Sequence, residues 1–448
     1  MNQYFKFLPN VIQNLIITIY NTYQYRLRHG GLYHDLREQY LLFDSSSRDE
    51  IEKESKRRLK EFLNFAIKYS PWYKNVNLKH GLSDFPILEK KDLVEKIDQI
   101  KTISEFDAIT SYTGGTTGSS LKVFYTKPDI QDRNAALDNF RASFGYKLGL
   151  KTAWFSGKDL ISRNDLKKGI CYKEDWINKI RFFSTYHINE LNFDIYWDCF
   201  QSFAPEFIVG FPSSVLVLCK IANDRGIKYN GRVKVFFPTA ETVLDDHREI
   251  ISNVLGCRVV DQYASSEGAP FIFECKEGNK HMNTLTGLFE VVDENMSPSN
   301  EGEMLVTSFS THGTPLIRYR IGDSLKLPNA DFKCKCGSEF PIVESIKGRS
   351  NDFLISPENG LVNLGNISNC TKKVNGIIRF QIEQNLINEL IIKIVPSKVY
   401  NQREQNLFEQ ALRARFGISM KFIFKIVKSI PVEKSGKFRI VKNNLKNN

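Results

Sequence analysis

The sequence predicts an α/β protein: a large N-terminal domain of α/β layers with a β-rich subdomain, then a small mobile α+β C-terminal domain. Three observations support this. Short apolar runs alternate with helical stretches between residues 120 and 265, β segments with Gly and Pro turns follow, and a compact set of elements ends the chain. Because 448 residues are too many for one core, we expect a helical region at 1–110, a core at 111–348 and a mobile domain at 349–448.

A long amphipathic helix is expected near the N-terminus. Ser47 and Glu50 have the spacing of a capping box, in which each side chain binds the backbone of the other. Apolar residues follow at helical spacing until Pro71 ends the run.

An earlier helix is indicated by the apolar stretch from residue 11 to residue 20. It is too short and too interrupted to span a membrane. The spacing of Ile12, Leu15, Ile16 and Tyr20 favours packing against the core. Peripheral contact with a membrane surface is the alternative for this helix.

The middle of the chain predicts a parallel sheet. Apolar runs indicate strands at 152–156, 207–210, 233–237 and 259–263, and Pro212 opens a helix directly after the second of them. Helical stretches between such runs are typical of parallel α/β layers.

The two regions that follow the predicted parallel sheet have a different pattern of apolar residues. Short segments such as 287–292 and 302–306 predict a β-rich subdomain. After residue 349, strands are expected at 377–382, 390–394 and 422–427, with a helix at 402–415 before the last of them.

Composition excludes several classes of protein. Hydrophobic residues at 42% and charged residues at 25% are ordinary for a globular protein, so these values exclude a disordered or a fibrous protein. The net charge is +11, yet no zinc-finger, homeodomain or single-strand-binding signature accompanies it, so nucleic acid is not an expected partner. Eight cysteines without a signal peptide favour a reducing compartment, and we expect a cytoplasmic protein without a transmembrane span.

A polar loop at residues 111–122 is the first indication of chemistry. It holds three glycines and six serine or threonine side chains directly before an apolar run. Glycines let backbone N–H groups point toward one centre, and hydroxyls add donors, so the loop is suited to phosphate. The spacing is neither that of a Walker loop nor Gly-x-Gly-x-x-Gly, and a plain turn is the alternative.

Four more segments are polar at the end of an apolar strand pattern, where α/β sheets place ligands. They are Pro238 to Glu241, Asp261 to Gly268, Arg318 to Asp323, and Pro431 to Arg439. With these segments the chain resembles the adenylate-forming superfamily, and within it the phenylacetate–CoA ligase-like branch found in capsular polysaccharide clusters. The resemblance covers almost the whole chain and follows the family's order: Thr-Gly-Gly-Thr-Thr-Gly, Thr-Ala-Glu, Tyr-Ala-Ser-Ser-Glu, Arg-Tyr-Arg-Ile-Gly-Asp, Gly-Arg-Ser-Asn-Asp and Ser-Gly-Lys-Phe-Arg.

The resemblance implies a role for each matching position. The loop over the ATP phosphates would be Thr113, Gly114, Gly115, Thr116, Thr117 and Gly118, with Thr116 acting in catalysis. Ala240 and Glu241 would lie by the adenine, Tyr263 would stack on the purine beside Gln262, and Asp323 would accept both ribose hydroxyls. Ser266 would reach a phosphate, and Glu267 would hold magnesium in the catalytic step.

The same resemblance implies a moving C-terminal domain. Arg349 and Asp352 would lie at the junction, with Asp352 as the hinge, and Lys437 would be the mobile lysine of adenylation. A carboxylate that attacks the α-phosphorus brings two anions together, so a lysine stabilises charge that develops in the transition state. Each residue alone has an ordinary alternative: a turn for Asp323, a sheet aromatic for Tyr263, a surface lysine for Lys437.

A second constellation has the residue types of a metal site. Cys275, His281, Cys334 and Cys336 supply three thiolates and one imidazole, which suits tetrahedral zinc in a structural role. Free surface thiols are the alternative. The other five cysteines are expected to be small apolar fillers. His187 and His312 lack the serine and acid partners of a hydrolase, which favours structural histidines.

These observations predict an ATP- and magnesium-dependent ligase that forms an acyl-adenylate and passes the acyl group to CoA or to an amine on a sugar or amino acid. Its setting would be polysaccharide biosynthesis. The alternative from another class is a nucleotide-binding assembly protein of such a pathway that does not catalyse.

Overall fold

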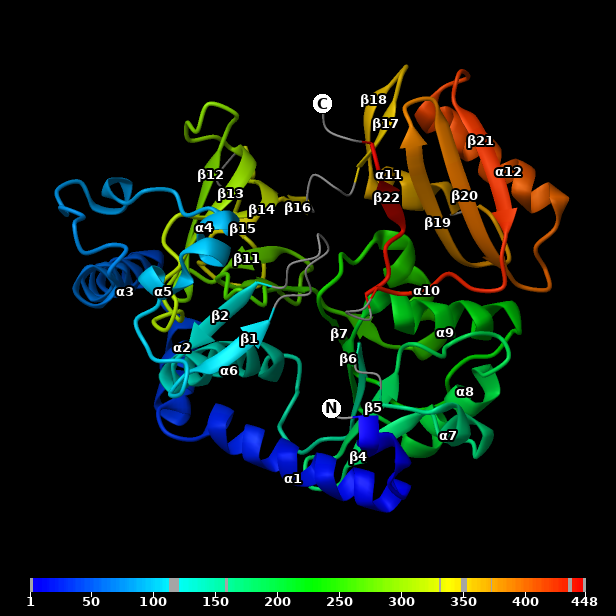
Figure 1. Cartoon of the computed structure of the whole chain (residues 1–448), viewed down its shortest axis with the longest axis horizontal. Coiled ribbons are helices and arrows are strands. Elements are labelled where there is room, and N and C mark those ends of the chain that lie inside the picture. Colours follow the sequence, from blue (N-terminus) through cyan, green and yellow to red (C-terminus); the bar gives the residue numbers. More distant parts are fainter. Residues whose placement is uncertain are drawn as a thin grey trace. The chain divides into compact units, whose positions relative to one another are not determined.

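The computed structural model contains two compact units, each assembled from separate stretches of chain. Unit 1 comprises Met1–Ile19, Gly149–Val259 and Ser350–Asn448, and unit 2 comprises Tyr20–Leu148 and Val260–Arg349. The structure describes residues 3–112, 121–157, 160–329, 332–347, 353–371, 373–433 and 437–445. Figure 1 labels the elements of both units.

Unit 1 is built on a six-stranded sheet with the strand order β4-β5-β3-β6-β7-β8. All neighbours pair in parallel except the edge strand β4, which is antiparallel to β5. The strands are β3 (Thr152–Ser156), β4 (Tyr172–Asp175), β5 (Ile180–Ser184), β6 (Phe207–Gly210), β7 (Val235–Pro238) and β8 (Arg258–Val259). The predicted parallel sheet is confirmed, although the run at 259–263 divides between β8 here and β9 in unit 2.

Helices follow the strands of this sheet and bury its apolar side chains. They are α7 (Arg163–Lys167), α8 (Phe193–Phe203), α9 (Pro212–Asp224) and α10 (Asp245–Leu255). Phe155, Phe183, Phe200 and Phe236 are at most 1% exposed in the resulting core. Pro212 begins α9 as predicted, because its fixed φ suits the first turn and its missing N–H needs no partner there.

The C-terminal part of unit 1 is a small α+β assembly, as the sequence predicts. A four-stranded sheet has the order β21-β20-β19-β22, and Phe408 and Leu412 of α12 pack against it. The elements are β17 (Phe353–Ser356), β18 (Gly360–Asn363), α11 (Leu364–Ser368), the 3-10 helix η4 (Asn369–Thr371), β19 (Ile377–Leu386), β20 (Glu389–Pro396), α12 (Gln402–Phe416), β21 (Lys421–Ile426) and β22 (Val441–Asn443).

Unit 2 combines helices with antiparallel sheets. Its helices are α2 (Tyr33–Phe43), α3 (Arg48–Tyr69), η2 (Gly81–Asp84), α4 (Lys90–Glu95), α5 (Ile97–Ile100) and α6 (Lys127–Ala142). The Ser47 and Glu50 capping box opens α3 as predicted. The sheets are β1 (Ile109–Tyr112) with β2 (Lys122–Tyr125); β15 (Ile342–Val343), β11 (Lys280–Met282), β10 (Ile272–Glu274) and β9 (Gln262–Tyr263); and β12 (Gly287–Val292), β13 (Glu301–Ser308), β14 (Tyr319–Lys326) and β16 (Ser345–Lys347).

The first long helix, α1 (Asn10–His29), follows the short 3-10 helix η1 (Gln3–Phe7) and differs from its prediction. Ile12, Leu15, Ile16 and Tyr20 were expected in the core, but they are 43%, 47%, 41% and 57% exposed. The buried face of α1 instead combines Ile17 with polar side chains, of which Asn14 and Thr18 accept backbone N–H groups of β4 and of the turn after it. Among the described residues, α1 and every other helix is too short or too polar to cross a membrane.

Candidate active site

The nucleoside-binding residues predicted in unit 2 meet as a hydrogen-bonded pair. Tyr263 lies in β9 and Asp323 in β14, and the Tyr263 hydroxyl donates to Oδ2 of Asp323 at 2.7 Å. Gln262, beside Tyr263, is only 9% exposed, and its side-chain oxygen accepts from Nε of Arg141 at 3.2 Å. The Gln262 amide thus helps to hold β9 in place.

The turn that carries Ser266 and Glu267 is fixed by its backbone. The carbonyl oxygen of Ser266 accepts from the hydroxyls of Tyr125 and Ser111, at 3.0 and 3.2 Å. Oγ of Ser265 accepts from the backbone N–H groups of Gly268 and Ala269. This leaves the side chain of Ser266 exposed, whereas Glu267 is only 5% exposed.

Gly268 is required where this turn ends. Its φ is +111°, and a Cβ there would lie 2.6 Å from Cγ2 of Thr311 and 2.7 Å from the Tyr125 hydroxyl. Arg133 also donates to the Gly268 and Ala269 carbonyls, at 2.8 and 3.1 Å. The position of Glu267 is therefore set by the fold around it.

In unit 1 the carboxylate of Glu241 lies at the N-terminus of α9. The parallel strands β6 and β7 end side by side, and Glu241 follows β7 while α9 follows β6. Oε2 of Glu241 accepts from the Ser213 backbone N–H at 3.0 Å, and Oε1 accepts from the Ser213 hydroxyl at 3.0 Å. A carboxylate is stabilised there because the first N–H groups of a helix have no partner within the helix.

Two backbone features make this arrangement possible. Ala240 has a φ of +65°, a strained value for a residue with a side chain, and strain of this kind often accompanies functional sites. Gly210 ends β6 with a φ of +148°, and a Cβ there would lie 2.1 Å from the carbonyl oxygen of Phe155. Both lie at the carboxyl ends of parallel strands, where α/β sheets bind ligands.

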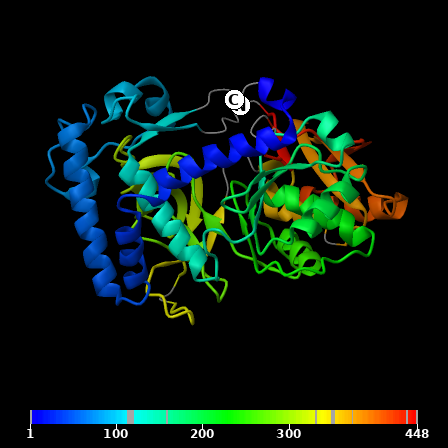
Figure 2. The same ribbon diagram turned by 90° about the horizontal axis from the view of Figure 1, so that it is seen from below.

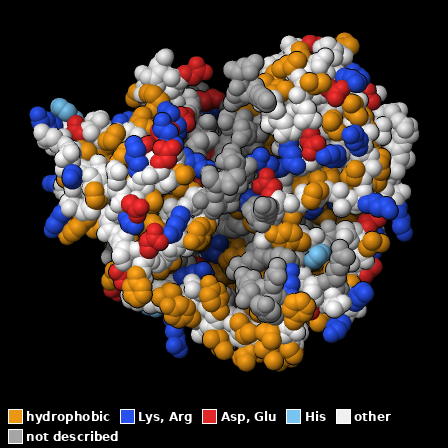
Figure 3. Space-filling view, viewed as in Figure 1, with side chains coloured by type: hydrophobic (Ala, Val, Ile, Leu, Met, Phe, Trp, Pro, Cys, Tyr) orange, Lys and Arg blue, Asp and Glu red, His pale blue; other side chains and the backbone are white. Residues whose placement is uncertain are grey.

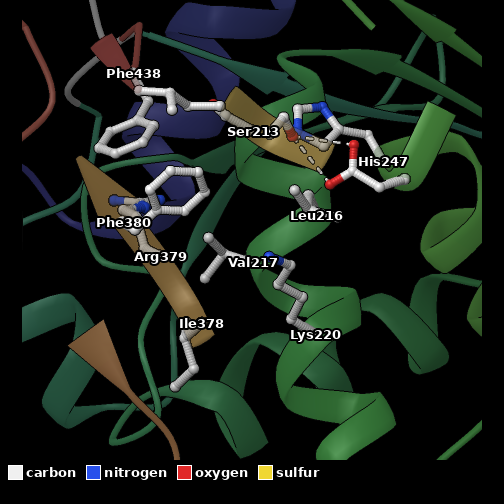
Figure 4. Close-up of a pocket in the computed structure, with 12 residues that line it drawn as sticks. Ser213, Leu216, Val217, Lys220, His247, Ile378, Arg379, Phe380 and Phe438 are labelled. Carbon is white, nitrogen blue, oxygen red and sulfur yellow. Dashed lines mark hydrogen bonds between the residues drawn. The ribbon is translucent and has the colours of Figure 1, made fainter. Parts of the chain in front are cut away.

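Glu241 also holds the segment that carries Lys437. Oε1 accepts from the backbone N–H of Phe438 at 2.9 Å, and the Arg379 guanidinium lies 4.6 Å from the centre of the Phe438 ring (Figure 4). Loss of hydration raises the pKa of Glu241 above its usual range, although these hydrogen bonds and the nearby Lys437 act in the opposite direction. The segment also makes internal contacts. The Glu433 N–H donates to the Lys437 carbonyl, and Arg439 forms an ion pair with the Glu433 carboxylate.

A small pocket lies beside this contact, between α9, α10 and β19 (Figure 4). Its volume of about 30 Å³ has room for one or two waters and not for a substrate. Burial lowers the pKa of Lys220, and it lowers the pKa of Arg379 to about 10. On the pocket wall, both carboxylate oxygens of Asp246 accept from the Ser368 hydroxyl, which joins α10 to α11.

The four predicted metal ligands come together in unit 2. One donor atom from each of Cys275, His281, Cys334 and Cys336 lies within 4.8 Å of all the others. The Cys275 and Cys334 sulfurs are 3.6 Å apart, and the Cys336 sulfur is 3.5 Å from Nε2 of His281. A tetrahedral zinc with Zn–S of about 2.3 Å and Zn–N of about 2.0–2.1 Å requires separations of about 3.8 and 3.6 Å, so the spacing of these two pairs suits zinc.

The groups around this cluster also suit a metal. Nδ1 of His281 is 2.8 Å from the Phe340 carbonyl oxygen, which leaves Nε2 to face the sulfurs. Burial alone would raise the pKa of Cys334, but hydrogen bonds from the Cys336 N–H and the Asn279 amide outweigh it and lower the pKa to about 6. A thiolate is the form that binds metal.

His312 has the structural role that the sequence predicts. Its Nδ1 lies 2.7 Å from Oδ1 of Asp129, and the same carboxylate accepts the backbone N–H groups of His312 and Gly313. Cys171, Cys219, Cys257 and Cys370 are buried as expected for apolar fillers, whereas Cys199 is half-buried.

Several predicted residues lie outside the described part of the chain. These are Thr113, Gly114, Gly115, Thr116, Thr117, Gly118, Arg349 and Asp352. Phe438 and Arg379 were not predicted as site residues. Phe438 directly follows the predicted lysine, but no sequence signal pairs it with Glu241.

Comparison with known proteins identifies relatives along the whole chain. Residues 354–444 match the family model of the CapK C-terminal domain. The chain is 32% identical to protein CapK of Staphylococcus aureus, over 100% of both chains. It is 25% identical to the phenylacetate-coenzyme A ligase of Pseudomonas putida, over 72% of this chain and 76% of that one, and 25% identical to the indoleacetate–lysine synthetase of Pseudomonas savastanoi, over 54% and 59%.

Solved structures agree on the fold. A 2-hydroxyisobutyryl-CoA ligase in the postadenylation state has a TM-score of 0.70 at 16% identity, over 90% of this chain and 91% of that one. The same ligase in the thioesterification state has a TM-score of 0.56 at 17% identity, over 89% and 91%. The fold predicted from the sequence is confirmed. The chain belongs to the CapK family of proteins, and its fold is that of the acyl-CoA ligases.

Proposed function

We propose that this enzyme uses ATP to convert a carboxylic acid into an acyl-adenylate and then transfers the acyl group to a thiol or an amine, releasing AMP. The observation that carries the proposal is the hydrogen bond from Phe438 to Glu241. It places the segment of Lys437 at the carboxyl ends of β6 and β7, the edge at which α/β sheets bind ligands.

In this proposal Lys437 is the catalytic cation. The attack of a carboxylate on the α-phosphorus brings two negative groups together, and a fixed positive charge lowers the energy of that transition state. Glu241 is a positioning residue, because it holds the neighbouring backbone N–H of Phe438 while remaining bound to Ser213 of α9. The strained backbone at Ala240 supports such a role.

The nucleoside would be bound by residues of unit 2. Asp323 would accept the ribose hydroxyls, and its hydrogen bond from Tyr263 would orient the carboxylate. The Tyr263 ring would stack on the purine, beside Gln262. The glycine- and threonine-rich loop at 113–118 would bind the phosphates, with Thr116 acting in the catalytic step.

Magnesium and zinc would have different places. Glu267 is a buried carboxylate on a rigid turn, which suits it as a magnesium ligand near Ser266. When bound, magnesium neutralises phosphate charge as pyrophosphate leaves. Cys275, His281, Cys334 and Cys336 would hold a structural zinc, because four protein ligands leave no open coordination position.

Arg349 and Asp352 would form the junction of a mobile domain at 349–448, with Asp352 as the hinge. The boundaries at 110 and 348 likewise remain predictions. A place in polysaccharide biosynthesis is supported by the CapK relative alone. A location in the cytoplasm likewise remains a prediction.

The acceptor is either CoA or an amine. One relative is a CoA ligase and another joins an acid to lysine, so both acceptors have a precedent among related proteins. The test is AMP release from ATP with a panel of carboxylic acids, each assayed with CoA, lysine or an amino sugar. We expect one acid to stimulate AMP release and one acceptor class to raise the rate further. If every acid fails with every acceptor, the proposed function is wrong.

A further inference from the structure

Helix α1 is fixed to unit 1 by its polar side chains. Oδ1 of Asn14 accepts from the Glu174 backbone N–H at 3.1 Å, and Oγ1 of Thr18 accepts from the Trp176 backbone N–H at 3.2 Å. Oδ1 of Asn10 accepts from Nζ of Lys173 at 2.8 Å. Because residues 10, 14 and 18 lie four apart, they form one stripe along the helix, and this stripe covers the outer edge of β4.

Apart from Ile17, which is buried in the core, the apolar side chains in the first half of α1 consequently point away from the protein. Figure 2 shows the helix along its full length, and Figure 3 shows hydrophobic side chains gathered at the lower edge, where α1 lies in Figure 1. We define the α1 patch as five exposed side chains of this helix together with Trp176, whose backbone N–H donates to Thr18: Val11 (67% exposed), Ile12 (43%), Leu15 (47%), Ile16 (41%), Ile19 (62%) and Trp176 (46%).

This arrangement is the reverse of an ordinary surface helix. Gln13, Asn14 and Thr18 are at most 5% exposed, whereas the isoleucines at 12, 16 and 19 are 41% to 62% exposed. A helix in a globular protein normally buries its apolar stripe, and a contiguous exposed apolar face marks a site of interaction. The hydrogen bonds with β4 and with the turn after it fix the orientation of α1, so that its apolar stripe faces outward.

The charge around the patch indicates what it binds. The first 34 residues contain no Asp or Glu, while Lys6, Arg26 and Arg28 are positive. Lys179 is exposed on the turn that follows Trp176. The carboxylates of the adjoining strand β4 are occupied: Asp175 is 1% exposed and accepts the Ile177 and Asn178 N–H groups, and Glu174 pairs with Arg181.

We propose that the α1 patch binds the surface of an anionic membrane, with α1 lying in the plane of the headgroups. Apolar and aromatic side chains on one face of a helix, with basic residues nearby and acidic residues lacking, suit that interface. Exposed Tyr20 and Tyr23 continue the stripe along the same helix. A second copy of the chain would instead bring two positive, acid-free helices together, which charge repulsion disfavours.

The test uses the full chain and vesicles of equal parts phosphatidylglycerol and phosphatidylcholine, with phosphatidylcholine vesicles for comparison. In a flotation assay we expect the protein to rise with the anionic vesicles. The bound fraction should be smaller at high salt. The triple variant Val11→Ser/Leu15→Ser/Ile19→Ser should bind them at least tenfold more weakly. The matched control is Phe106→Ser/Leu191→Ser/Ile418→Ser, which removes side chains that are 97%, 91% and 86% exposed elsewhere and should leave binding unchanged.

A second measurement does not depend on the triple variant. Lipids brominated near the headgroup should quench part of the tryptophan fluorescence of the wild-type protein, and Trp176→Phe should remove that part. The proposal is overturned if the wild-type protein does not bind the anionic vesicles, or if the triple variant binds them as tightly as the control variant does. It is also overturned if light scattering shows a dimer that the triple variant dissociates while vesicles bind neither form.

Discussion

The carboxylate of Glu241 accepts a hydrogen bond from the backbone N–H of Phe438 at 2.9 Å, although the two residues are 197 positions apart in the chain. The same carboxylate binds the backbone N–H and hydroxyl of Ser213 at the start of α9. Glu241 therefore joins the ligand edge of the parallel sheet to the segment that carries Lys437, and the predictions for catalysis begin from this contact.

Replacing Glu241 should slow adenylation without abolishing ATP binding. A hydrogen bond to a charged acceptor contributes about 1.5–3 kcal/mol, so Glu241→Ala should lower the rate of acid-dependent pyrophosphate exchange by about 10- to 100-fold. The Michaelis constant for ATP should change much less, because Glu241 acts on the lysine segment. Glu249→Ala, at an exposed position of α10, is the control. Equal exchange rates in the two variants would show that Glu241 does not position Lys437.

The pair formed by Tyr263 and Asp323 should be measurable in nucleotide affinity. Asp323→Ala removes the proposed ribose acceptor and should weaken ATP binding by about 10- to 100-fold in calorimetric titrations. Tyr263→Phe keeps the ring and loses only the hydroxyl that donates to Asp323 at 2.7 Å. This variant should therefore weaken ATP binding several-fold at most. Exposed Tyr69 offers the control Tyr69→Phe. Unchanged affinity in Asp323→Ala would remove this pair from the nucleotide site.

The cysteine and histidine cluster should contain one zinc per chain when metal content is measured by mass spectrometry. Cys336→Ser should lose the metal and lower the melting temperature, because metal binding contributes to folding. Cys199→Ser, outside the cluster, should retain it. If the protein contains no metal and its melting temperature is the same before and after a chelator, the cluster does not bind a structural metal.

Asp129 should make the protein sensitive to acid. Burial alone would raise the pKa of Asp129, but hydrogen bonds from His312 and from the Thr126 N–H outweigh it and hold the pKa below its usual range. A carboxyl whose pKa is lower in the folded state stabilises the fold above its unfolded pKa of about 3.9, and that stabilisation is lost as the pH falls further. Asp129→Asn should therefore flatten the fall in unfolding free energy below pH 4, whereas Asp198→Asn should not. An unchanged acid profile in Asp129→Asn would contradict this assignment.

Local patterns in the sequence predict most elements, because their causes are local. The Ser47 capping box, Pro212 at the start of α9 and the apolar run of β3 each appear where predicted. That Cys275, His281, Cys334 and Cys336 lie together could also be predicted, since thiolates and imidazole have a narrow range of functions.

Orientation and distant pairing could not be predicted in the same way. The apolar spacing of α1 indicates a helix, but which face meets the protein depends on hydrogen bonds that Asn14 and Thr18 accept from backbone N–H groups about 160 positions away, in β4 and the turn after it. The antiparallel edge strand β4 carries no signal that separates it from its parallel neighbours. The resemblance implies that Glu241 lies by the adenine, and no local pattern indicates that its carboxylate contacts Ser213 and Phe438.

The central claim is that Lys437 stabilises the transition state in which a carboxylate captures the AMP moiety of ATP. The most direct measurement is exchange of labelled pyrophosphate into ATP, stimulated by an acid, in the wild-type protein, in Lys437→Ala and in Lys428→Ala, which changes an exposed lysine of the same region. We predict acid-dependent exchange in the wild-type protein and in Lys428→Ala, and a loss of about 10²-fold or more in Lys437→Ala. Equal exchange in all three proteins, or no exchange with any acid, would contradict it.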